Sequence, residues 1–189
     1  MLSFALVFAG TFDGERFAAP SRYERAFYRE LKPISDHFQP EALQVNGLDR
    51  DRLLAVGIDP AAAMTEAAEW VIQRAKRSRP VLVAYPLSFD WSWLYWYFVR
   101  FSQLGSPFCH SQCFDVKTAF AVKARIPISK AGRSQIPALL RPAGAHRHHA
   151  RADAIEQAKI FAALFRWEAP GACKRLTSAE SCPRAASPI

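Results

Sequence analysis

The segment 81–84, Val-Leu-Val-Ala, constrains the fold of this chain more than any other. A run of four apolar residues between turn signals is typical of a short strand that is buried on both faces. Asp59 and Pro60 lie upstream of it as an N-cap followed by a proline at the first helical position, and they predict a helix to about residue 76. Pro86 ends the strand, and an aromatic segment, 90–101, predicts the next helix. A buried strand between two helices is typical of a layered α/β fold.

The N-terminal part of the chain predicts antiparallel strands and then a short helix. Asp13-Gly14 is a strong hairpin signal, because both residues tolerate the backbone angles of a tight turn. Pro40 begins a helix that Asn46-Gly47 ends. The strands expected here are 2–9, 16–19 and 26–31. A strand meander therefore comes before the helix, strand and helix of the α/β unit.

The C-terminal half predicts two helices that flank a long irregular segment. Asp115 caps a helix to about residue 124, and the last helix covers 150–167. The segment 126–146 contains three prolines and two glycines, so we expect a loop with at most a short helix near 136–140. The chain is expected to form one domain, 1–167, followed by a disordered tail, 168–189, that is rich in Pro, Ser and Ala.

The cysteines lack the dense, regular spacing of a disulfide scaffold, which favours a reducing, cytoplasmic location. They are Cys109, Cys113, Cys173 and Cys182. One alternative is a zinc site made by Cys109, His110 and Cys113 together with His146 or His149. Structural zinc sites use paired cysteine or histidine spacings, and no second matching pair is present here, so this alternative fits poorly.

The positive charge of the chain is concentrated in one stretch. The formal net charge is +8, and the segment between Asp115 and Asp153 contains basic residues but no Asp or Glu. These residues are Lys117, Lys123, Arg125, Lys130, Arg133, Arg141, Arg147 and Arg151. Lysine and arginine contacts to phosphates displace counterions and give affinity for any polyanion. A solvated basic face is the alternative, but the neighbouring His148 favours a phosphate-bearing substrate.

Two acidic residues and one histidine are the candidate catalytic groups. His148 precedes Asp153 by five residues where a loop runs into the last helix, and Asp90 stands at the start of the aromatic helix. This spacing suits a proton acceptor beside a metal-binding carboxylate. His149 is the rival to His148 if the register differs by one residue.

The order of elements over residues 2–167 resembles the ribonuclease H-like fold of the DEDDh-type 3′–5′ exonucleases. This group includes RNase T, oligoribonuclease and the proofreading subunit of DNA polymerase III. The segment His148-x-Ala150-x-x-Asp153-Ala154 resembles the third motif of the family, and Ser88-Phe89-Asp90-Trp91 resembles the second. The resemblance implies that Asp90 and Asp153 are metal ligands and that His148 is the general base. It also implies two Mg²⁺ or Mn²⁺ ions, a single-stranded DNA or RNA substrate and, as in some relatives, a homodimer.

The first motif of the family, an Asp-x-Glu on the central opening strand, has no counterpart in the expected position. We favour an incomplete reading frame, in which upstream DNA encodes the missing strand. A second interpretation is an inactive relative that still binds nucleic acid through Lys130, Arg133, Arg147 and Arg151. A third uses Asp13 and Glu15, which have the Asp-x-Glu spacing, although an exposed turn is the better interpretation of this pair. A fourth is an adaptor for protein contacts.

The aromatic helix admits two interpretations. Its rings, Trp91, Trp93, Trp96 and Tyr97, can stack on the bases of a single strand, but packing against the sheet is the expectation for so apolar a helix. The aromatic run also falls far short of the ~20 residues that cross a membrane, so no membrane contact is expected.

Overall fold

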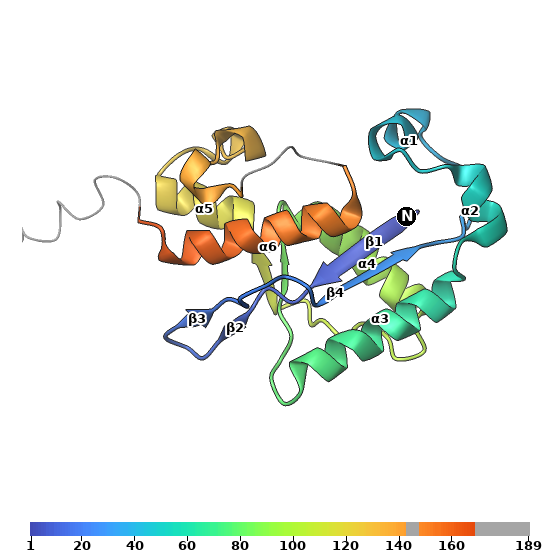
Figure 1. Ribbon diagram of the computed structural model, residues 1–189, viewed down its shortest axis with the longest axis horizontal. Coiled ribbons are helices and arrows are strands. Elements are labelled where there is room, and N and C mark those ends of the chain that lie inside the picture. Colours follow the sequence, from blue (N-terminus) through green and yellow to red (C-terminus); the bar gives the residue numbers. More distant parts are fainter. Residues whose placement is uncertain (143–147, 169–189) are drawn as a thin grey trace, which may run out of the picture.

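The computed structural model describes residues 1–142 and 148–168, and these residues form a layered mixed α/β fold (Figure 1). The strands are β1 (Ser3–Val7), β2 (Thr11–Phe12), β3 (Phe17–Ala18), β4 (Ala26–Glu30), β5 (Leu82–Ala84) and β6 (Cys113–Asp115). The helices are α1 (Pro40–Asn46), α2 (Arg50–Val56), α3 (Pro60–Ala75), α4 (Leu87–Phe101), α5 (Val116–Ala124) and α6 (Ala150–Arg166). Short 3-10 turns follow α5 at Ile128–Lys130, Arg133–Gln135 and Ala138–Leu140.

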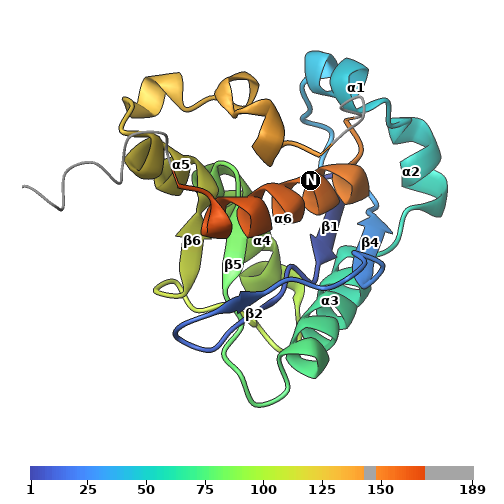
Figure 2. The ribbon, with the colours of Figure 1, turned by 60° about the vertical axis from the view of Figure 1, so that its left-hand side comes forward.

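The strands form separate two-stranded ladders. β1 pairs with β4 in antiparallel fashion, with Ser3 opposite Glu30 and Val7 opposite Ala26. β5 pairs with β6 in parallel, and β2 pairs with β3 in a hairpin. Across Figure 2 the strands run in the order β6, β5, β1 and β4. Within the described residues, no ladder joins β1 to β5, so each of these strands has a strand partner on one side only.

Helices cover the strands on both sides. α6 packs against β1, β4 and β5, whereas α3 packs against α4 and β4, and α4 contacts β5 and β6 (Figures 1 and 2). The main core lies among the strands, α3 and α4, because alternate strand residues and one face of each helix point inward. Its largest buried members are Phe4, Phe27, Leu31, Met64, Leu94, Tyr97, Phe98 and Phe108.

A second core joins α5, α6 and the segment after α5. Its buried members are Val116, Phe120, Ala121, Ala131, Ile136, Leu140, Ile160, Phe161 and Leu164. Ala131, Ile136 and Leu140 come from the segment that the sequence marks as irregular, so this basic segment is anchored to α6 rather than loose. Burial of a Leu or Ile side chain contributes roughly 1.5–3 kcal/mol, enough for a few such anchors to order a segment without long helices.

Most elements follow the expectations from the sequence. The 2–9 and 26–31 strands, the hairpin at Asp13-Gly14, and the helices that begin at Pro40, Pro60 and Val116 are confirmed. Gly47 ends α1 in the left-handed conformation, with φ of 66°. The last helix is confirmed to Arg166, and the expected tail lies outside the described residues beyond Glu168.

Three expectations need correction. α4 begins at Leu87 rather than at Asp90, because Pro86 supplies an extended N-cap and the Leu87 backbone N–H finds an acceptor in the Asp115 carboxylate. α2 and β6 were not expected. The Asp49 side chain, which accepts a hydrogen bond from Arg52 N, is the N-cap signal that marks α2. β6 has only three residues, too few for a periodicity signal.

The aromatic helix is only partly buried. Tyr97 packs in the core as expected. The expectation that the aromatic rings of this helix pack on the sheet is wrong for Trp93 and Trp96, which are about half exposed. No helix within 1–142 or 148–168 is both long and apolar enough to span a membrane.

Candidate active site

Asp90 and Asp153 come from different helices, and their charges interact. Asp90 is in the first turn of α4, and Asp153 is in the first turn of α6. Burial, and next the negative charge of Asp153, raise the pKa of Asp90 from 3.8 to about 6. Two carboxylates that share a partly buried site repel each other, and a bound cation relieves this repulsion.

Hydrogen bonds fix the position of the start of α4 relative to α6. The Gln157 side-chain oxygen on α6 accepts a hydrogen bond from the backbone N–H of Tyr85, at 3.0 Å, just before α4. The Asp115 carboxylate accepts one from Leu87 N at 2.6 Å and another from Thr118 N at 2.5 Å. The ends of β5 and β6 therefore fix the start of α4, which carries Asp90, next to the start of α6, which carries Asp153.

Arg133 lies beside Asp153 and Glu156. Its guanidinium makes a two-point contact with the Glu156 carboxylate, with Nε donating to Oε1 at 3.1 Å and Nη2 close to Oε2. The same Nη2 lies 3.9 Å from Asp153 Oδ1. The sequence predicts a nucleic-acid contact for Arg133, and in the structure this side chain is held in an intramolecular ion pair on the candidate site.

Both histidines before α6 are exposed, and His148 directly precedes the helix N-cap, His149. The ring of His149 lies 4.8 Å from the ring of Tyr28 on β4, and its carbonyl oxygen accepts a hydrogen bond from Asp153 N at 2.9 Å. His149 therefore contacts β4 while it stays exposed, so exposure does not distinguish the two histidines.

Two of the other predicted basic contacts are on the surface of the described residues. Lys130, in the first 3-10 turn, and Arg151, in the first turn of α6, are both exposed. Arg147 and His146 lie outside the described residues.

The oxygen donors fit a hard divalent cation. Mg²⁺ is usually held in proteins by one or two carboxylates together with waters and substrate phosphates, and Asp90 and Asp153 provide two such carboxylates. Within the described part of the chain, no three His, Cys, Asp or Glu side chains are grouped to hold a metal ion. The described residues thus supply two carboxylates, Asp90 and Asp153, which are part of the ligand set that a metal ion needs. We call this pair the half-site. Cys109 and Cys113 are free thiols.

Asp13 and Glu15 lie in the exposed turn between β2 and β3. Asp13 Oδ1 accepts hydrogen bonds from Glu15 N at 2.9 Å and from Arg16 N at 2.7 Å. The Arg16 and Glu15 amides lower the pKa of Asp13. The interpretation of this pair as a turn is confirmed, since the Asp13 carboxylate stabilises the hairpin itself.

Comparison with known proteins identifies one relative of this chain. Over 132 residues the chain is 33% identical to the 3′-5′ DNA exonuclease Cap18 of Escherichia coli, and the match covers 69% of this chain and 70% of that protein. The chain belongs to the same 3′–5′ exonuclease family. No family model matches the sequence.

Several residues of this exonuclease-family chain that shape the site were not identified from the sequence. Glu156 and Gln157 follow Asp153 by three and four positions, so helical periodicity alone places them on its face. Asp115 was identified only as a helix cap, and its second bond to Leu87 depends on the tertiary arrangement. No local signal marks the contact between Tyr85 and Gln157.

Proposed function

We propose that this chain is a 3′–5′ exonuclease of the ribonuclease H-like DEDDh type that removes nucleotides from the 3′ end of single-stranded DNA. The observation that carries the proposal is the placement of Asp90 and Asp153 in the first turns of α4 and α6, two helices whose starts are linked by the hydrogen bond from Tyr85 N to Gln157. The family membership supports the reaction class, and the name of the E. coli relative supports DNA as the substrate.

The residues have distinct roles in the proposed reaction. Asp90 and Asp153 hold Mg²⁺ or Mn²⁺, which supplies charge neutralisation for the terminal phosphodiester. His148 takes a proton from the attacking water, the water oxygen bonds to phosphorus, and the bond from phosphorus to the 3′ oxygen breaks. The products are a nucleoside 5′-monophosphate and a strand one residue shorter with a free 3′ hydroxyl. Lys130, Arg147 and Arg151 contact the phosphates of the strand.

We further propose that a strand carrying an Asp-x-Glu pair, from sequence outside these 189 residues, fits between β1 and β5. Each of these strands lacks a ladder partner on its second side within the described residues, and Figure 2 places them next to each other in the strand order. Such a strand would complete one mixed sheet, in the order β6, β5, inserted strand, β1 and β4. Its two acidic residues would add to the half-site of Asp90 and Asp153.

A catalytically inactive nucleic-acid-binding relative is the second candidate. The observation that favours it is the two-point contact between Arg133 and Glu156 beside Asp153, because a guanidinium already compensates negative charge at the half-site. Under this alternative the chain binds single strands, with an affinity that falls steeply as salt rises, but degrades none.

One experiment separates the two candidates. A 5′-labelled single-stranded DNA is incubated with Mg²⁺ or with EDTA and either the 189-residue chain or a version extended at its N-terminus by an Asp-x-Glu strand. We expect the extended version to shorten the DNA from its 3′ end in Mg²⁺ but not in EDTA. The substitutions Asp90→Asn, Asp153→Asn and His148→Ala in the extended version should abolish this activity. Asp49→Asn, at the cap of α2, is the matched control and should stay active. Activity that persists in Asp90→Asn and Asp153→Asn contradicts the assignment, and binding without degradation by either chain supports the inactive relative.

A further inference from the structure

Helix α4 exposes a line of aromatic side chains that ends in a cation. Phe89, Trp93, Trp96 and Arg100 are spaced by four, three and four residues, so they share one face of the helix. Phe89 is 64%, Trp93 49% and Trp96 47% exposed. We name these four residues the α4 stripe. Large exposed rings that are contiguous mark a surface that binds something, because isolated apolar groups are common on protein surfaces but continuous rows are not.

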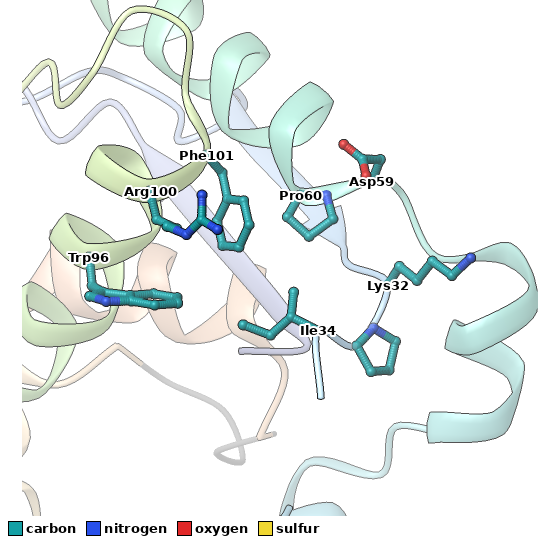
Figure 3. Close-up of a pocket in the computed structure, with 8 residues that line it drawn as sticks. Lys32, Ile34, Asp59, Pro60, Trp96, Arg100 and Phe101 are labelled. Carbon is teal, nitrogen blue, oxygen red and sulfur yellow. The ribbon is translucent and has the colours of Figure 1, made fainter. Parts of the chain in front are cut away.

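The stripe leads into a pocket at the C-terminal end of α4 (Figure 3). The pocket has a volume of about 470 Å³. Its walls come from α4, the segment after β4 and the start of α3, and they include Trp96, Arg100, Phe101, Lys32, Ile34 and Asp59. In Figure 3 Trp96 and Arg100 lie on one side of the pocket and Lys32 lies on the other, with its ammonium group directed away from Arg100.

The aromatic ring at the junction of stripe and pocket is held in place. Trp96 makes edge-to-face contacts with the rings of Tyr97, at 5.3 Å, and Phe101, at 5.7 Å. These neighbours restrict the indole while about half of its surface stays exposed. A ring ordered before binding loses little conformational entropy when a flat ligand stacks on it.

The charges at the pocket favour an anion. Lys32 and Arg100 are exposed, and neither forms a salt bridge with any residue in the described ranges. The carboxylate in the pocket, Asp59, is already engaged as the N-cap of α3, where it accepts hydrogen bonds from Ala61 N at 2.8 Å and Ala62 N at 3.2 Å. Two cations thus lie at the rim of the pocket, while its acidic group is compensated by the helix start.

We propose that the α4 stripe and the pocket bind single-stranded DNA, with bases on Trp93 and Trp96 and with phosphates of the strand at Arg100 and Lys32. The proposal rests on the proposed exonuclease function and specifies where the strand runs as it leaves Asp90. Ten residues of helix separate Asp90 from Arg100, or about 15 Å at 1.5 Å per residue. This length matches roughly four stacked nucleotides at ~3.4 Å each. Stacking on aromatic rings tolerates any base, because every base has a flat π-face.

Binding of a fluorescent 5′-labelled oligothymidylate tests the proposal in EDTA, where no strand is degraded. Fluorescence anisotropy is measured for the whole chain and for Trp93→Ala, Trp96→Ala and the double substitution Lys32→Ala/Arg100→Ala. We expect each tryptophan substitution to weaken binding about fivefold or more, and the double charge substitution to reduce the salt dependence as well. Trp96→Phe, which keeps a ring, should retain most of the affinity.

Two controls match these variants. Tyr95→Ala removes a similarly exposed ring of α4 that is stacked on Trp91, away from the stripe. Arg77→Ala removes an exposed cation after α3, outside the pocket. Both should bind the oligonucleotide as the parent chain does. Thermal unfolding of each variant checks that the chain still folds.

The outcomes distinguish the site from the function. Parent-like binding by the folded Trp93→Ala and Trp96→Ala variants overturns the proposed path while leaving the exonuclease proposal intact. No binding of the oligonucleotide by the parent chain overturns both. If the tryptophan variants lose self-association in light scattering but keep DNA binding, the stripe is an interface between two copies, and the DNA proposal is wrong.

Discussion

The Asp115 carboxylate, at the end of β6, accepts a hydrogen bond of 2.6 Å from the backbone N–H of Leu87 at the start of α4. Its other oxygen accepts from Thr118 N at 2.5 Å and caps α5. One side chain therefore connects the start of the helix that carries Asp90 to the neighbouring strand and to the next helix. The position of Asp90 relative to Asp153 depends in part on this connection.

Asp115→Ala should lower the free energy of unfolding by about 2–3 kcal/mol, because it removes a helix cap and leaves the Leu87 amide without its acceptor. Asp49→Ala is the matched control, since Asp49 caps α2 alone, and it should cost about 1 kcal/mol. Urea unfolding of both variants measures the difference. Equal losses would show that the bond to Leu87 contributes nothing.

Asp90→Asn should stabilise the chain in EDTA at neutral pH. The pKa of Asp90 is raised from 3.8 to about 6 in the folded state, first by burial and then by Asp153. The folded chain thus binds this proton more tightly than the unfolded chain, so the unfolding free energy falls as pH rises through the interval from about 4 to 6 and stays lower above it. The asparagine removes the effect, with a gain of roughly 2–3 kcal/mol at pH 7 and none at pH 3.5.

Chemical unfolding across this pH range checks the prediction. Asp51→Asn, at an exposed position in the first turn of α2, is the control and should give no gain at any pH. If the free energies of unfolding of the parent chain and of Asp90→Asn differ by the same amount at pH 3.5 and at pH 7, the raised pKa of Asp90 is contradicted.

Arg133 and Glu156 should show a coupling free energy of about 1–2 kcal/mol in a double-mutant cycle with alanine. Their contact has two points, and both side chains are partly buried, at 31% and 20% exposure, so solvent screens the pair only in part. Arg22 and Glu24, which form an ion pair at 80% and 74% exposure, are the matched pair and should couple by less than about 0.5 kcal/mol. Similar coupling free energies in the two pairs would contradict the prediction that partial burial strengthens the contact between Arg133 and Glu156.

Gly57→Ala should destabilise the chain by more than about 2 kcal/mol. A Cβ at this position would lie 2.4 Å from Leu53 O and 2.6 Å from Lys32 N, both of them backbone atoms that cannot move alone. The close approach is required by hydrogen bonds from Lys32 N to Ile58 O and from Ile58 N to Glu30 O.

Gly132→Ala is the control for this substitution, because its nearest contact is the flexible Ser134 Oγ at 4.0 Å. Thermal unfolding should show little change for Gly132→Ala. A Gly57→Ala variant that is as stable as Gly132→Ala would contradict the packing of this turn.

The sequence predicted the local elements well where their signals are local. Asp59-Pro60, Asn46-Gly47 and Asp13-Gly14 each act through hydrogen bonds or backbone angles within a few residues, so their effects can be inferred without the rest of the chain. The start of α4 was placed three residues late because the acceptor for Leu87 N comes from Asp115, in another part of the sequence. The exposure of Trp93 and Trp96 was missed because an aromatic helix gives no strong polar face that would indicate which rings point outward.

By itself, the sequence determined the mixed α/β class, the helix and turn boundaries with local caps, and the identity of Asp90, His148 and Asp153 as candidate groups. Only the tertiary structure decided that Asp90 and Asp153 interact, that Arg133 is paired with Glu156 beside them, and that one face of α4 stays exposed next to a cationic pocket. The physical reason is the range of the interactions. Caps and turns act over a few neighbouring residues, whereas charge coupling and exposure depend on which distant elements pack together.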